Sequence, residues 1–239
     1  MTQEYAILYF AIFLFSGVQS IFGVGLLLFG TPTLLLLGYP YADTLWILLP
    51  ASVTISIIQV IRGYTYISPD RTVYLFTVPP LAVCLIFTLI QRDSFDITKV
   101  IGVALLFVGV IRYSSHLKHI LTGLIKRHIK SYCIFMGAVH GFSNMGGGLL
   151  SVLMVNIYNE KYAIRTNIAL VYLIFVVSQL CVLTFVSPDA NASFDVWVCI
   201  VALLSYLTVG RFLARTINDS QYQEWVTGVI LVYGLLLVF

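Results

Sequence analysis

Two clusters of glycine, each flanked by polar residues inside a long apolar stretch, are the part of this sequence best suited to bind a ligand. The first contains Gly23 and Gly25, and the second is a run of three that begins at Gly146. Gln19 and His140 precede their clusters by about one helical turn. A helix that begins after such a turn presents free backbone N–H groups and the positive end of its dipole. This arrangement predicts the binding of an anion.

The two clusters stand at matching positions in the chain. An interval of 121 residues separates Gln19 from His140 (140 − 19), and the same interval separates Gly25 from Gly146 (146 − 25). A Tyr-Ala pair follows each cluster at that interval as well. Helix-breaking segments at corresponding positions of two apolar halves are typical of transporters whose binding site lies between the breaks.

The candidate substrate-binding residues are the glycines of the clusters and the polar residues around them. They are Gln19, Ser20, Gly23, Gly25, His140, Ser143, Asn144, Gly146, Gly147, Gly148, Thr166 and Asn167. Glycine lets the backbone approach a ligand closely, although small residues also serve close helix packing in membranes. Thr166 and Asn167 could reach the same cavity, or they could cap the helix that starts there.

His140 is the one ionisable residue near either cluster, and it is a candidate for proton coupling. The alternative is a neutral histidine that donates to a neighbouring carbonyl. Ser143 is close in sequence, but no acidic residue is nearby to orient the histidine, which disfavours a nucleophile–base pair. The four cysteines lie in apolar segments without metal-ligand spacing, so we expect no metal and no cofactor.

The composition is that of a polytopic membrane protein. The chain is 60% hydrophobic and 10% charged, with a mean hydropathy of +0.99, whereas soluble domains carry about 25% charged residues. The start of the chain lacks a basic region and a cleavage site, which predicts no removable signal peptide. Six apolar segments approach the ~20 residues that cross a bilayer: residues 42–61, 72–91, 97–114, 162–186, 194–210 and 222–239.

The distribution of charge predicts the orientation. Short loops rich in Lys and Arg stay in the cytoplasm, so the basic stretch between Arg112 and Lys130 is expected inside. The loop at residues 187–194 has acidic residues and no basic residue, so it is expected outside. A single crossing by residues 132–158 would instead place this loop in the cytoplasm. A hairpin that enters and leaves on the same side removes this conflict, and 11 of the 13 basic residues then face the cytoplasm.

These observations predict an all-α polytopic membrane protein with two inverted repeats, each a broken-helix hairpin followed by three transmembrane helices. The first repeat would cover residues 1–115, with its hairpin at about 5–37. A basic cytoplasmic linker would cover 116–131. The second repeat would cover 132–239, with its hairpin at about 132–158. Both termini are expected outside the cytoplasm.

With these motifs in view, the chain resembles the sulfite exporter TauE/SafE family of membrane transporters. The resemblance rests on two glycine-centred copies of one pattern: Gly17, Gly23-Val24-Gly25, Pro32 and Tyr41-Ala42-Asp43-Thr44, and then Gly137, Gly141, Gly146-Gly147-Gly148 and Ala163-Ile164-Arg165-Thr166-Asn167. The resemblance implies transport of sulfite, an organosulfonate or a related small anion.

The function expected is a secondary transporter of a small anion in the bacterial inner membrane that works by alternating access. Its partners would be membrane lipid and the anion, with the proton as a candidate coupling ion, and no nucleic acid is expected. Two alternatives remain at this point. An anion channel would share the site, and a membrane-embedded enzyme would need catalytic groups at membrane depth. The sequence leaves the oligomeric state open.

Overall fold

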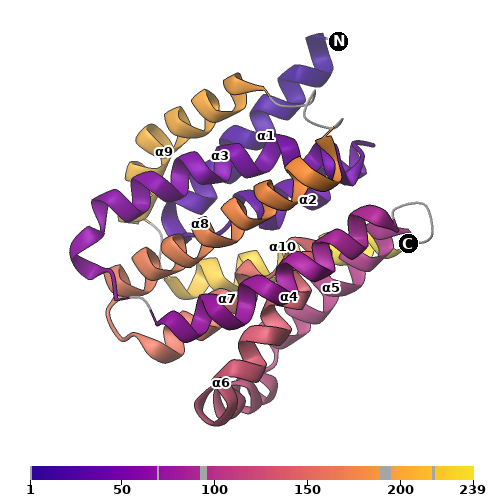
Figure 1. The fold of residues 1–239 in the computed structure, drawn as a ribbon. Helices are drawn as coiled ribbons and strands as arrows, with labels where there is room; N and C mark the ends of the chain where they lie inside the picture. Colours follow the sequence, from indigo (N-terminus) through magenta and orange to yellow (C-terminus); the bar gives the residue numbers. More distant parts are fainter. Residues whose placement is uncertain (1, 69, 92–95, 189–194, 217–218) are drawn as a thin grey trace.

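The protein is described by a computed structural model that covers residues 2–68, 70–91, 96–188, 195–216 and 219–239. These residues form helices without any strand (Figure 1). The helices are α1 (Thr2–Phe22), α2 (Leu26–Leu36), α3 (Tyr41–Arg62), the short 3-10 helix η1 (Tyr64–Tyr66), α4 (Arg71–Ile90), α5 (Ile97–Tyr113), α6 (Ser115–Ser143), α7 (Gly147–Ile157), α8 (Lys161–Val186), α9 (Val196–Thr216) and α10 (Asp219–Val238).

The helices suit a protein that crosses a membrane several times. The six apolar segments predicted as spans fall on α3, α4, α5, α8, α9 and α10. Among the described residues, α3, α4 and α8 are each long and apolar enough to cross, and α5 with α6, bent by 88°, is a fourth candidate. Large apolar side chains such as Val83 and Phe185 are exposed by 66% and 85%, as expected where lipid covers the surface.

Helices from the two halves of the chain pack against each other throughout the molecule. α3 lies beside α8 at the centre, and α5 lies beside α10 (Figure 1). α1 packs on α9, while α6 packs on α4. α3 also contacts α9, and α4 also contacts α8. The centre of the bundle is therefore built by both halves.

The first helix pair, α1 and α2, folds back on itself. α1 ends at Phe22, and Gly23 follows in the left-handed region with a φ of 78°. Ile7, near the start of α1, lines one surface hollow together with residues 37–40, which follow α2. Both ends of this pair thus lie beside the start of α3 at Tyr41.

The second pair, α6 and α7, folds back at the other end of α3. The Lys130 ammonium lies 5.2 Å from the centre of the Phe76 ring, and the Tyr158 hydroxyl donates to the Ser68 carbonyl. Both ends of this pair therefore lie near the segment that joins α3 to α4. α3 has 22 residues, so about 33 Å of helix separates the open ends of the two pairs.

The predicted linker is helical. Residues 116–131 lie within α6, which contains one residue of non-helical backbone, His128 at φ −140° and ψ 53°. His128 divides α6 close to the predicted boundary at residue 131. Side chains before this division, such as His119, Ile120 and Arg127, are exposed. The part of α6 after it forms the first arm of the second pair.

Candidate functional site

The two predicted helix breaks have the same backbone geometry. Gly23 has a φ of 78° and its N–H donates to the Gln19 carbonyl at 2.9 Å. Asn144 has a φ of 62° and its N–H donates to the His140 carbonyl at 2.8 Å. Each helix thus ends on a left-handed residue, which is a common way to terminate an α-helix. These two residues stand at the matched interval in the sequence.

Two further glycines are required because each turn folds tightly against the helix before it. A β-carbon on Gly25 would lie 2.7 Å from the backbone nitrogen of Gln19, and a β-carbon on Gly146 would lie 2.5 Å from Cβ of His140. Atoms do not approach this closely without displacing the backbone. The fold itself therefore accounts for glycine at these two positions.

The side chains of Gln19 and His140 cap the helices that follow the breaks. Gln19 Oε1 accepts the N–H of Leu26 at 3.3 Å, and His140 Nδ1 accepts the N–H of Gly146 at 3.1 Å. Gln19 Nε2 donates in turn to the hydroxyls of Ser52 and Ser56 on α3, at 3.2 and 3.3 Å. Each cap takes up one of the amide groups that a helix start leaves without an intrahelical acceptor.

Other amide groups at the two helix starts remain available. The N–H groups of Leu27 and Leu28 at the start of α2 have no acceptor in the part of the chain that the structure describes. The same holds for Gly147 and Leu149 at the start of α7. Each break therefore presents spare donors at the positive end of a helix dipole.

The two breaks meet inside the molecule. Cγ1 of Val24 lies 3.1 Å from the position that a β-carbon on Gly147 would occupy. Asn144 Nδ2 donates to Thr31 Oγ1 on α2 at 2.9 Å, which joins the second break to the helix after the first. The breaks are closed to solvent, because the side chains of Gln19, His140 and Asn144 have 0% exposure.

Two glutamines that are absent from the predicted set support the breaks. Gln59 on α3 donates through Nε2 to the carbonyls of Gln19 and Ser20 at 3.0 and 3.4 Å, so it satisfies the end of α1. Gln179 on α8 donates to Asn144 Oδ1 at 3.2 Å. Both are polar amides inside apolar helices, and this is the feature of the sequence that could have identified them.

The predicted serines lie at the breaks but bond to their own helices. Ser20 Oγ donates to the Gly17 carbonyl at 2.6 Å. Ser143 Oγ donates to the Val139 carbonyl at 2.6 Å and accepts the N–H of Met145 at 3.3 Å. Their hydroxyl protons are thus committed to backbone carbonyls.

Thr166 and Asn167 bond in a different place. Thr166 packs against Gly63 after α3, and Asn167 accepts the N–H of Ser68 at 3.0 Å and donates to the Tyr66 carbonyl at 3.0 Å. The structure therefore brings these two residues to the segment between α3 and α4. Neither of them caps α8, because that helix begins earlier, at Lys161.

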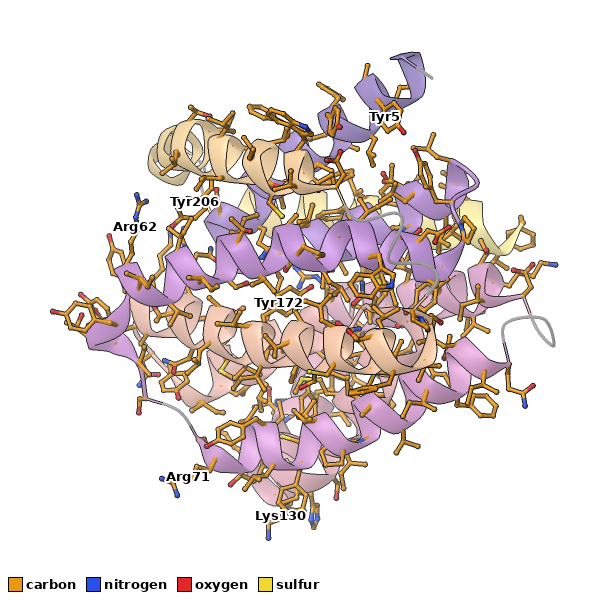
Figure 2. The ribbon with its side chains drawn as sticks, turned by 45° about the horizontal axis from the view of Figure 1, so that its top comes forward. Tyr5, Arg62, Arg71, Lys130, Tyr172 and Tyr206 are labelled. Atoms are coloured by element: carbon orange, nitrogen blue, oxygen red, sulfur yellow. The ribbon has the colours of Figure 1, made fainter. Side chains whose placement is uncertain are left out.

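Several buried polar atoms near the breaks have no hydrogen-bond partner among the described residues. They are His140 Nε2, Tyr172 OH, Gln59 Oε1 and Gln179 Oε1. Buried polar groups are normally paired, and those that are not need an explanation. Figure 2 places one of them, on Tyr172, in the middle of the molecule.

A comparison with protein families identifies the family of this chain. The family model described as sulfite exporter TauE/SafE matches residues 8–237. The chain belongs to this family. The predicted resemblance is therefore confirmed over nearly the whole TauE/SafE chain, and membership implies a membrane transporter of sulfite or related sulfur-containing anions. No curated protein and no solved structure matches the chain.

Proposed function

We propose that this TauE/SafE protein is a secondary transporter of sulfite or a related organosulfonate that binds its substrate at the two helix breaks. The observation that carries this proposal is the meeting of two matched breaks, each with spare amide donors, inside an apolar bundle. Backbone N–H groups at a helix start bind anions without a buried cation. Such a site can release its substrate as well as hold it.

The helix packing supports two repeats of five helices. The five helices α1–α5 can be matched in order with α6–α10, so that α1 corresponds to α6 and α4 corresponds to α9. The contact of α1 with α9 then corresponds to the contact of α6 with α4. The contact of α3 with α9 corresponds in the same way to that of α8 with α4. The pairs α3–α8 and α5–α10 correspond to themselves. This is the pattern that a two-fold axis between the repeats would give.

The placement of the hairpins supports the inversion of the repeats. Their open ends lie at opposite ends of α3, so one hairpin would enter from each side of the membrane. With the basic residues inside, the first would enter from the outside and both termini would lie there. Alternating access would follow from motion of one repeat against the other, which exposes the closed breaks first to one side and then to the other.

Proton coupling through His140 is part of the proposal. A buried imidazole gains a second proton only at a large cost in desolvation, which a bound anion nearby would offset. The anion and the proton would therefore enter together. Protonation of Nδ1 would also displace the bond from the Gly146 amide, which would couple the proton to the shape of the second break.

Uptake of radiolabelled sulfite into proteoliposomes tests the proposal. We expect saturable uptake that is accelerated when unlabelled sulfite is loaded inside, because a carrier exchanges substrate across the membrane. Gly123→Ala serves as a control variant that is expected to transport sulfite like the wild type, since a β-carbon at this position has nothing within 4 Å. Uptake that does not saturate and shows no exchange would identify a channel instead. The absence of any sulfite, thiosulfate or sulfoacetate flux would refute the proposal.

A further inference from the structure

Tyr172 carries a hydroxyl group that the fold does not use. The side chain lies on α8 with 0% exposure, and its OH has no hydrogen-bond partner among the described residues. Burying an unpaired hydroxyl costs free energy that phenylalanine would avoid. The hydroxyl therefore calls for a function outside the packing of the protein.

This hydroxyl lies at the start of α7. It is 3.4 Å from the position that a β-carbon on Gly147 would occupy, and Gly147 is the first residue of that helix. The N–H groups of Gly147 and Leu149 have no acceptor in the described part of the chain. The phenol donor of Tyr172 and these free amide donors therefore lie together at the start of α7.

The ring of His140 lies close to that of Tyr172, with 5.8 Å between the two ring centres. Because Nδ1 accepts the Gly146 amide, the proton of the neutral imidazole is on Nε2, which has no partner that meets hydrogen-bond geometry. The amide of Gln179, whose Oε1 is also unpaired, lies within reach of this ring.

The first break has no such set of donors. Both ends of the Gln19 amide are paired, with Leu26 on one side and with Ser52 and Ser56 on the other. The residue that matches Tyr172 at the repeat interval is Ala51 (172 − 51 = 121), which has no hydroxyl. The unpaired phenol of Tyr172 and the unpaired imidazole nitrogen of His140 thus have no equivalent at Ala51 and Gln19.

We infer that the second break recognises the substrate, with the Tyr172 hydroxyl and the His140 Nε2–H donating to the oxygens of an oxyanion seated at the start of α7. The first break contributes to the same site only the backbone N–H groups at the start of α2. This inference rests on the proposed function and deepens it. The phenol, imidazole and amide donors at this place favour a ligand that presents acceptors, as the oxygens of sulfite or a sulfonate do.

Tyr172→Phe tests the inference, because it removes only the unpaired oxygen. Binding of sodium sulfite is measured on the full-length protein in detergent, by titration and by the shift in melting temperature. We expect affinity to fall by about tenfold to a hundredfold, the usual effect of losing one hydrogen bond to a charged group. The melting temperature without sulfite should stay the same or rise.

Tyr41→Phe is the matched control. Tyr41 OH is also buried and unpaired, but it lies 11 residues before Ser52 on α3, or about 16 Å along the helix. We expect this variant to bind sulfite like the wild type. Equal affinity of Tyr172→Phe and the wild type, or an equal loss in both variants, would overturn the inference and leave the proposed function intact. A wild type that binds none of sulfite, thiosulfate and sulfoacetate would overturn both.

Discussion

Gln19 and His140 each accept a backbone N–H at the start of the helix that follows a break, although their side chains differ in chemistry. Gln19 accepts the N–H of Leu26 at 3.3 Å, and His140 accepts the N–H of Gly146 at 3.1 Å. An amide oxygen and an unprotonated imidazole nitrogen are both acceptors, so either can cap a helix start. The histidine differs in one respect, since it can also take up a proton.

The shared bond predicts the stability of two variants at position 140. His140→Gln brings in the side chain that caps the first break, so the N–H of Gly146 keeps an acceptor. His140→Leu leaves that buried donor unpaired, which costs about 1–3 kcal/mol. We expect the melting temperature in detergent to fall clearly for His140→Leu and much less for His140→Gln. A similar fall in both would argue against the capping role.

The proton-coupling role predicts a change in pH dependence. Between about pH 8 and 5, sulfite flux through the wild type should rise as the pH falls, because the buried imidazole would take up its proton together with the anion. His140→Gln retains a capping group but has nothing to titrate, so its flux should vary much less over this range. Fluxes corrected for the fraction of sulfite in each ionic form provide the measurement. Parallel pH profiles for the two proteins would exclude His140 as the coupling residue.

The tight turns predict a strong effect of alanine at two glycines. In Gly25→Ala and Gly146→Ala the added methyl group would overlap Gln19 and His140, so each turn must open or unfold. We expect a loss of at least about 2 kcal/mol in stability for each variant and little sulfite uptake. Gly123→Ala should leave both properties nearly unchanged. A stable Gly146→Ala protein with normal uptake would contradict the described geometry.

The left-handed residues at the two breaks, Gly23 and Asn144, are expected to tolerate substitution to different degrees. Gly23→Ala combines a positive φ with a methyl group that would lie 2.8 Å from Cγ2 of Ile168. Asn144→Gly keeps a residue that adopts this backbone readily. We therefore expect Gly23→Ala to unfold at a lower temperature than Asn144→Gly. Thermal unfolding followed by tryptophan fluorescence measures the order.

The breaks could be placed from the sequence because glycine is the visible mark of a turn inside an apolar segment. The interval between Gln19 and His140 placed these residues at corresponding positions, and in the structure both of them cap the helix after a break. The apolar runs located the long helices α3, α4 and α8, since length and hydropathy are local properties.

The partners of the breaks could not be predicted in this way. Gln59 and Gln179 reach the breaks from α3 and α8, so their roles depend on which helices pack together. Tyr172 resembles any other tyrosine in an apolar helix until its distance to the start of α7 is known. Thr166 follows the second cluster in sequence, yet it packs against Gly63, which belongs to the first half of the chain. Tertiary packing decides each of these cases.

The bond between Asn144 and Thr31 yields a prediction about the coupling of the two halves. It joins the second break to α2 at 2.9 Å, and both residues have 0% exposure. Thr31→Val removes the hydroxyl with little change in shape, and Asn144→Gly removes the amide while retaining the turn. If the bond stabilises the closed arrangement, the double variant should lose less stability than the sum of the two single variants. A coupling of about 1 kcal/mol is expected for a buried pair of this kind. Additive losses would show that the two residues act independently, and the hydroxyl would then have no part in holding the halves together.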